Sequence, residues 1–538
     1  MAYFTNLITN PAFQHFATKI LLHLDSQSLA KCRLLSHLFK EFIDNKKSLL
    51  FLQIRQANVK RVSRLVGYKA KMISNEIFVK RSYKRLSTEE LWSILIFMKD
   101  YCSRISPVGI PYKYNSYHVK INILEYASYH NHIDIVELLL KNSLDVEDIN
   151  SAWTSTDNVT ALHYACGKGN VEIVNLFESY KCIDFNVADE YGRTPLHFTC
   201  NFGQNNDKSI MRMLDYPDLP YPNGNEELIK LLLLSPKVSI DLQDVDGRTA
   251  FWYACTEGNF MAVKAFLDFA TKYDDLVDIN LPNDQGWTPF HLVCLFGHFE
   301  IAKALVDYHK IKKNVVFNIL DNDENNPMHF ACESGHVNIV KLLLEFSIQY
   351  DVEIGINTAG YHLLTPLHTA CMNGRFEVVK ILLEYSKAFE INFNATSQLG
   401  WTPLFLATHY GDLRMVNLIL NSKLDINPNL TDSHGRTPFH VACFEGRFDI
   451  VKLMLNSSIS NKRLRLNIQD NYGQTAMHLA CLNDNFEVIK LILELYPKLE
   501  INLNIIDKQG MTPMNIAFNQ NHQNIVRLGC KYLKYFKN

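Results

Sequence analysis

Hydrophobic and polar positions follow one recurring order along most of this 538-residue chain. A polar turn containing glycine precedes threonine, proline and a large apolar residue, as in Thr194-Pro195-Leu196-His197. A short apolar stretch comes next, followed by a second stretch in which apolar residues recur every three or four positions, as in 337–344. This periodicity is typical of amphipathic helices. Each copy therefore predicts a turn and two antiparallel helices.

The order recurs eleven times, and the first residue of each copy is called its anchor. The anchors are Asn122, Thr160, Thr194, Thr249, Thr288, Asn326, Thr365, Thr402, Thr437, Thr475 and Thr512. Successive anchors are 34 to 39 residues apart, except for one interval of 55. A period near 35 residues indicates a solenoid, in which each unit buries its apolar face only against its neighbours. The predicted fold class is an all-α solenoid of about 11 repeats.

The residues around each anchor suit the start and the end of a short helix. Threonine is a good N-cap, and proline fits the first helical position because the N–H it lacks would have no partner there. Glycines such as Gly192 in the turn and Gly297 after the first helix favour positive φ. We expect the extra length of these units to fall mainly in the loop between the second helix and the next turn.

The Thr-Pro-Leu-His motif, the glycine that follows it and runs such as Ile339-Val340 with Leu343-Leu344 resemble the ankyrin repeat. The resemblance extends from about Asn122 to the C-terminus, and it implies a long surface that binds another protein. Two copies depart from the pattern. About twenty residues rich in proline follow the copy at Thr194, which predicts an inserted loop near 204–226, with the second helix starting near Glu226. Asn515 replaces histidine in the last copy, as a capping repeat would allow.

The N-terminal segment carries apolar stripes that predict short helices, and so few residues cannot bury much apolar surface alone. Residues 10–54 resemble an F-box, although the leading Leu-Pro and the tryptophans of that family are missing. The resemblance implies an F-box-binding adaptor subunit and a cullin ligase core as partners. The residues implied to contact the adaptor are Ile20, Leu21, Leu24, Leu29, Leu35 and Phe39.

Composition is ordinary for a globular protein, with 47% hydrophobic and 20% charged residues, but the charge is unevenly distributed. Between Arg55 and Lys120 there are 14 Lys and Arg against 4 Asp and Glu, within a net charge of −2 for the chain. We predict a basic helical connector over 55–114 and place the repeat array at 115–538. A solvated connector that balances an acidic array is the preferred interpretation, and nucleic-acid binding is the weaker alternative.

No run of 18 apolar residues occurs, and the first residues lack a basic start followed by an apolar stretch. We therefore expect no membrane partner and an intracellular protein, cytoplasmic or nuclear or both. Its 12 cysteines should be reduced thiols in that setting. Eight of them lie six residues after an anchor, which predicts small buried side chains rather than disulfides.

Seven His-x-x-Cys pairs lie on the predicted first helices, and spacing i, i+3 puts both side chains on one face, as zinc would require. Each pair supplies only two ligands, however, and recurs at one place in seven units, which favours a structural role. We expect no metal and no cofactor. Phosphate-binding loops, dinucleotide fingerprints and nucleophile elbows are not found in the sequence, so we also expect no enzyme activity.

The residues at the ends of the first helices vary from unit to unit, and several are apolar where the repeat does not require it. Together with two tryptophans at the turns they form the candidate target-binding set. This set comprises Trp287, Leu295, Phe296, Met372, Trp401, Tyr410 and Phe444. The alternative is that these side chains fold back onto neighbouring units.

The two resemblances together imply a non-catalytic adaptor. The F-box-like segment would dock on an SCF-type (cullin-RING) ubiquitin ligase, and the array would bind an unidentified protein target. The alternative is an ankyrin scaffold unconnected to ubiquitin, in which the N-terminal helices cap the first repeat.

Overall fold

The computed structural model describes residues 123–142, 150, 158–201, 226–273, 276–461, 464–499 and 501–532. The segments predicted as the F-box-like module and the connector lie outside these residues, and so do Ile20, Leu21, Leu24, Leu29, Leu35 and Phe39. Residues 202–225, most of the predicted inserted loop, are likewise outside them. The second helix of that unit starts at Glu226, as predicted.

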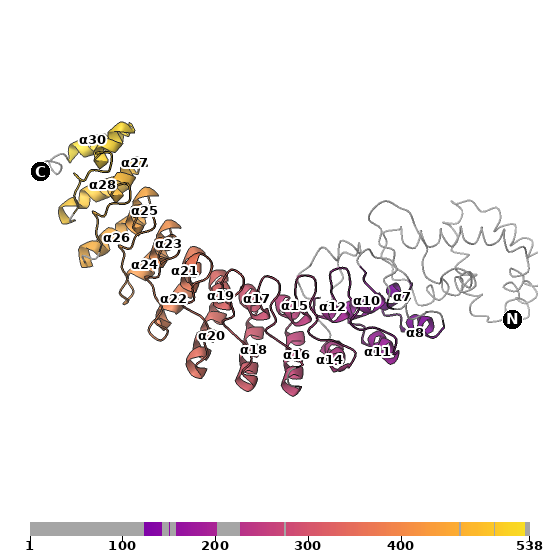
Figure 1. The fold of residues 1–538 in the computed structure, drawn as a ribbon. Coiled ribbons are helices and arrows are strands. Elements are labelled where there is room, and N and C mark those ends of the chain that lie inside the picture. Colours follow the sequence, from indigo (N-terminus) through magenta and orange to yellow (C-terminus); the bar gives the residue numbers. More distant parts are fainter. Residues whose placement is uncertain are drawn as a thin grey trace, which may run out of the picture. The chain divides into compact units, whose positions relative to one another are not determined.

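Every regular element in the described residues is helical, which confirms the predicted fold class (Figure 1). A first and a second helix follow each anchor. The first helices are α7 (Ile123–Tyr129), α10 (Ala161–Lys168), α12 (Pro195–Asn201), α15 (Ala250–Thr256), α17 (Pro289–Phe296), α19 (Pro327–Ser334), α21 (Pro366–Met372), α23 (Pro403–His409), α25 (Pro438–Phe444), α27 (Ala476–Leu482) and α29 (Pro513–Asn519). The second helices are α8 (Ile133–Asn142), α11 (Val171–Ser179), α14 (Glu226–Leu234), α16 (Phe260–Lys272), α18 (Phe299–Lys312), α20 (Val337–Tyr350), α22 (Phe376–Tyr385), α24 (Leu413–Leu420), α26 (Phe448–Asn461), α28 (Phe486–Leu495) and α30 (Gln523–Lys531). Two short 3₁₀ helices are η2 (Tyr361–Leu363) and η3 (Tyr496–Lys498).

The chain divides into two compact parts, an N-terminal part that ends within α12 and a C-terminal part that contains α14 to α30. In the C-terminal part each first helix packs on the next first helix, and each second helix packs on the next second helix (Figure 1). In the N-terminal part α7 packs on α10 and α8 packs on α11. Each part is therefore a two-layered stack that follows the order of the chain.

The apolar stripes predicted from the sequence form the core between the layers. In α20 the residues Ile339, Val340, Leu343 and Leu344 are all buried. All eight cysteines that follow an anchor by six residues are buried on the first helices, as predicted, and none of them forms a disulfide. Their small side chains allow neighbouring first helices to approach closely.

The extra length of the longer units was predicted in the loops, and that prediction is wrong. It lies mostly in the second helices, because α16, α18, α20 and α26 have 13 or 14 residues, whereas α11 and α24 have 9 and 8. The added turn keeps the helical spacing of apolar residues, and it buries Tyr308 in α18 and Phe346 in α20. Continuing the helix therefore covers more apolar surface than a longer loop would.

An aspartate organises the polar turn before most anchors. The carboxylate of Asp244 accepts hydrogen bonds from the backbone N–H groups of Asp246 and Arg248 at 3.0 and 2.9 Å. Gly247 has φ +78°, and a Cβ placed there would lie 2.6 Å from Asp284 Oδ1 in the next turn. Glycine is thus required both by the backbone conformation and by the close approach of successive turns.

The histidines of the repeat join each turn to the helix that follows. In seven units ring Nδ1 accepts a hydrogen bond from the anchor's backbone N–H, at 3.0 to 3.2 Å. Because Nδ1 is an acceptor, the neutral ring must carry its proton on Nε2. In six of these units Nε2 then donates to a backbone carbonyl of the next unit, for example from His329 to Leu364 at 2.9 Å and from His478 to Met511 at 3.0 Å. Each of these six histidines therefore bonds its own turn and the next one.

These rings are held in the neutral form. Burial lowers the pKa of His163 to about 3, and it lowers the pKa values of His291, His329 and His368 to about 4. Protonation of Nδ1 would remove the acceptor of the anchor's N–H and would place a charge in the core. The turn network therefore requires neutral histidine.

Stability should consequently fall in mild acid. Above pH 6.5 the histidines are neutral in both the folded and the unfolded chain, whereas between pH 6.5 and about 4 only the unfolded chain takes up protons. The expected loss at pH 5 is about 1–2 kcal/mol for each buried histidine. Urea unfolding followed by circular dichroism at pH 7.5 and pH 5.0 measures it. His368→Gln should reduce this difference, because it removes one of the buried histidines. Equal midpoints at the two pH values would contradict the prediction.

Candidate functional site

The His-x-x-Cys pairs are buried in the repeat, and their histidines are hydrogen-bonded within the array. Both ring nitrogens of histidines such as His329 and His478 are hydrogen-bonded to the protein. Burial raises the pKa of Cys166 to about 12, so its thiol stays protonated at neutral pH. Within the described segments no group of three or more His, Cys, Asp or Glu side chains could hold a metal ion. The candidate site must therefore be sought on the surface.

The ends of the first helices are held in place by the next unit. His336 Nε2 donates to the Leu295 carbonyl at 3.0 Å, and Asn485 Nδ2 donates to the Phe444 carbonyl at 2.7 Å. Arg375 Nε makes the same kind of contact with the Glu333 carbonyl at 2.7 Å. These bonds satisfy carbonyls that a helix end leaves without partners. Side chains at the helix ends thus project from a fixed backbone.

Five residues of the candidate target-binding set lie at these helix ends. Phe296 at the end of α17 is 47% exposed, and Tyr410 directly after α23 is 51% exposed. Leu295, Met372 and Phe444 are partly buried. Exposed aromatic rings on a rigid backbone favour protein binding, because they offer contact area at little cost in conformational entropy.

The two tryptophans of the set pack against other side chains of the array. Trp287 meets Phe330 of the next unit edge to face, with ring centroids 5.2 Å apart. Trp401 stacks on Phe405 at 5.5 Å with an interplanar angle of 17°, and its ring also lies 5.5 Å from His409. Both tryptophans are partly buried. A contact between either of them and a target stays a prediction.

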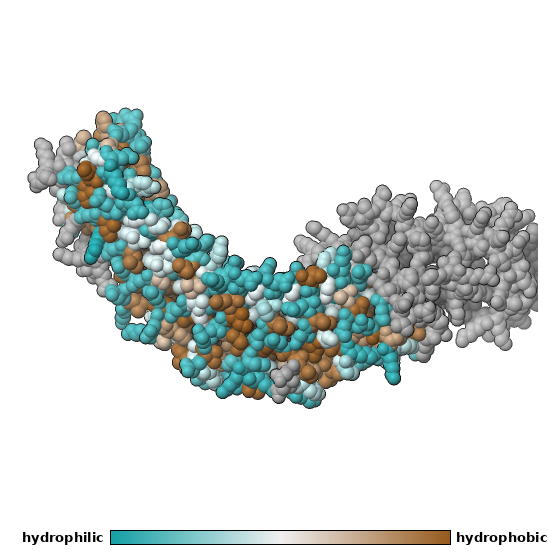
Figure 2. Space-filling model, viewed as in Figure 1, coloured by the Kyte–Doolittle hydropathy of each residue, from teal (hydrophilic) through white to brown (hydrophobic). Residues whose placement is uncertain are grey.

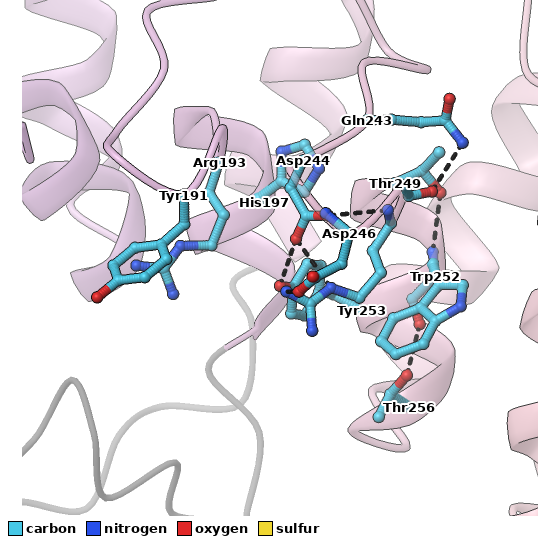
Figure 3. A network of polar contacts seen from close by, with 12 residues as sticks. Tyr191, Arg193, His197, Gln243, Asp244, Asp246, Thr249, Trp252, Tyr253 and Thr256 are labelled. Carbon is cyan, nitrogen blue, oxygen red and sulfur yellow. Dashed lines mark hydrogen bonds and ion pairs between the residues drawn. The ribbon is translucent and has the colours of Figure 1, made fainter. Parts of the chain in front are cut away.

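Ion pairs stiffen some of the turns. Arg248 lies between the carboxylates of Asp244 and Asp246, at 2.9 and 2.5 Å, and its guanidinium group covers the ring of Tyr253. The Tyr253 hydroxyl donates to Asp244 Oδ2 at 2.7 Å (Figure 3). The turn of the unit at Asn326 has Asn325 in place of this arginine, and burial raises the pKa of its Asp321. Turns within one array therefore differ in charge.

The apolar residues at the tips of the turns were not among the residues predicted from the sequence. Tyr361, Leu363, Leu399 and Tyr472 are exposed there, between a turn's first residue and its anchor. The sequence signal was a large apolar side chain in a turn that is polar in other copies. Figure 2 shows hydrophobic residues as separate patches on a mainly hydrophilic face.

The family model for ankyrin repeats matches residues 124–216, 221–316, 309–395, 387–464 and 459–532. The human transient receptor potential cation channel subfamily A member 1 is 31% identical over 141 residues, 23% of this chain and 12% of the channel. Palmitoyltransferase AKR1 of Lachancea kluyveri is 28% identical over 150 residues, 28% of this chain and 17% of the relative. Human SMC5-SMC6 complex localization factor protein 1 is 45% identical over 58 residues, 11% of this chain and 6% of the relative.

The chain thus spans less than a fifth of the length of each of these relatives. The matches show shared repeats, and the activities of the whole relatives do not follow from them. Of the helices described for this chain, none has both the length and the apolar character needed to cross a membrane.

The cysteines should differ sharply in reactivity. Cys530 is exposed and should react with iodoacetamide in the native protein, whereas the eight buried thiols that follow the anchors should not. Peptide mass spectrometry after brief labelling at pH 8 measures this. Labelling in 8 M urea provides the control, because all thiols should then react. Native labelling of Cys294 or Cys332 at the rate of Cys530 would show that the core is more open than described.

Proposed function

Because the chain belongs to the ankyrin-repeat family, we propose that it is a non-catalytic adaptor that binds a protein target at the ends of its first helices. The observation that carries the proposal is the exposure of Phe296 and Tyr410 on helix ends whose backbone is fixed by the next unit. Leu295, Met372 and Phe444 extend the apolar surface around them.

The chemistry of this surface suits binding rather than catalysis. Burying one exposed aromatic side chain contributes about 1–3 kcal/mol, so a few of them suffice for a specific contact. Since the histidines and cysteines of the repeat are committed to the core, the variable helix ends are left to distinguish one target from another. The target is thus recognised by shape and apolar contact.

We further propose that the adaptor is the substrate receptor of an SCF-type ubiquitin ligase. The support is the F-box-like pattern of residues 10–54, in which Ile20, Leu24 and Leu29 hold the spacing of the family motif. In this arrangement the ligase supplies the catalysis. The chain supplies proximity, because a target held on the array meets the ligase at a high effective concentration.

The second candidate is a scaffold without a link to ubiquitin, whose N-terminal helices cap the first repeat. It is favoured by the missing Leu-Pro and tryptophan positions of the F-box-like pattern. In this case residues 1–54 serve stability alone, and deleting them should lower the unfolding midpoint without loss of any partner.

Substitutions at the helix ends test the target-binding surface. Phe296→Ser with Tyr410→Ser should reduce recovery of the target about tenfold or more, since two exposed rings leave the contact. Affinity purification with quantitative mass spectrometry compares this variant with wild type. Ile311→Ser with Ile348→Ser removes equally exposed apolar residues from the second helices and is the matched control. A loss of partners in the control alone would place the target on the other layer.

Substitutions in the N-terminal segment test the ligase connection. Ile20→Asp with Leu24→Asp should abolish recovery of an adaptor subunit and a cullin, because charges would replace the apolar side chains that the F-box resemblance assigns to the adaptor contact. The target itself should still be recovered, since the array is unchanged. An adaptor and cullin absent from the wild-type purification would leave the scaffold as the better description.

A further inference from the structure

The tips of the turns in the part of the chain that contains α14 to α30 form one hydrogen-bonded row. Backbone N–H groups of one turn donate to carbonyls of the turn before it, from Asn322 to Gln285 at 3.0 Å, from Gln398 to His362 at 2.8 Å and from Ser433 to Leu399 at 2.8 Å. The Tyr361 N–H donates to Asn325 Oδ1 at 3.3 Å, and this bond joins the turn at 360–364 to the turn at 321–325. Neighbouring tips are therefore held side by side and present one fixed surface.

Three exposed apolar side chains lie on two neighbouring tips of this row. Tyr361 and Leu363 belong to one tip and are 54% and 51% exposed, and Leu399 on the next tip is 49% exposed. The bond between the His362 carbonyl and the Gln398 N–H ties the two tips together. We call Tyr361, Leu363 and Leu399 the apolar tip cluster.

Leu363 occupies a backbone position that suits glycine. It has φ +58°, whereas glycine holds the corresponding place in the next two turns, at Gly400 with φ +76° and Gly435 with φ +77°. The Gly360 N–H donates to the Leu364 carbonyl at 2.8 Å and closes the turn in the usual way. A leucine with positive φ is unfavourable, so the turn would fold more readily with glycine. The chain therefore keeps an exposed leucine where neither folding nor packing needs one.

Charge on the preceding tips indicates what this cluster contacts. Asp284, Asp323 and Glu324 are exposed on the two turns before it. None of the residues 283–287, 321–326, 358–364 and 397–401 is lysine or arginine. By contrast, Asp246 on an earlier tip is neutralised by Arg248. The row therefore presents acidic carboxylates followed by apolar side chains.

We infer that this row docks a peptide segment of the protein target in which lysine or arginine residues lie beside large apolar ones. The apolar residues cover the apolar tip cluster, and the basic ones lie against Asp284, Asp323 and Glu324. The inference rests on the proposed function and names the chemistry of the partner. Because hydrogen bonds fix the tips in advance, little conformational entropy is lost on binding.

Selection of a random 16-residue peptide library, displayed on phage, against the full-length protein tests the inference. Enriched sequences should combine lysine or arginine with leucine or an aromatic residue. The affinity of a selected peptide, measured by fluorescence anisotropy, should fall at least tenfold for Leu363→Gly with Leu399→Ser. For Asp323→Asn with Glu324→Gln it should fall severalfold, with a weaker dependence on salt. The control Ile311→Ser with Ile348→Ser, which changes exposed apolar residues of the second helices, should bind as wild type does.

A loss of folding cannot explain the expected result, because Leu363→Gly relieves an unfavourable backbone conformation and should keep or raise the thermal midpoint. Acidic or purely apolar selected peptides would overturn the inference, as would equal affinity for the tip variant or the absence of any enriched sequence. A loss confined to the Phe296 and Tyr410 variant would also overturn it, while supporting target binding at the helix ends. Failure of the proposed function itself would appear separately, in the affinity purification.

Discussion

The fold depends on one buried histidine in each of most units, which accepts a hydrogen bond from its own anchor and donates one to the next unit. The first bond closes the turn onto the helix, as between Thr475 and His478 at 3.0 Å. The second bond means that a turn is complete only when its neighbour is folded. A unit of this size cannot bury its apolar face alone, and this bond adds a polar reason for the same dependence. Folding is therefore shared along the stack.

This constraint explains why residues that are elsewhere catalytic are inert here. Histidine and cysteine at fixed spacing would suggest a metal site, yet a ring with both nitrogens hydrogen-bonded cannot also bind zinc. The cysteine sulfur meets the neighbouring first helix, where its small volume matters more than its thiol. The chemistry of the repeat is used for stacking, and the positions that stacking does not fix remain free to vary.

Periodicity in the sequence was sufficient to predict the anchors, the paired helices and the buried cysteines, because all of these follow from local spacing. The lengths of the second helices were mispredicted, since whether Tyr308 or Phe346 continues a helix depends on burial against the next unit. The packing of Trp287 on Phe330 of the next unit agrees with the alternative stated from the sequence, but the partner ring, 43 positions away, could not be identified there. The apolar tip cluster was missed because only the stacked structure places the tip that carries Tyr361 and Leu363 next to the tip that carries Leu399. The F-box-like residues stay a prediction.

Some positions of this array carry residues that the ankyrin-repeat pattern does not require. An apolar side chain at a helix end, such as Phe296, or a leucine in place of a turn glycine, does nothing for stacking and costs solvation or backbone energy. The stack tolerates such costs because each unit is held by two neighbours. The exposed rings at helix ends lie in the units anchored at Thr288 and Thr402, and the leucine in place of a turn glycine lies before Thr365, between them. A single partner that lies across adjacent units would need this distribution, since residues scattered over distant units could not be contacted together.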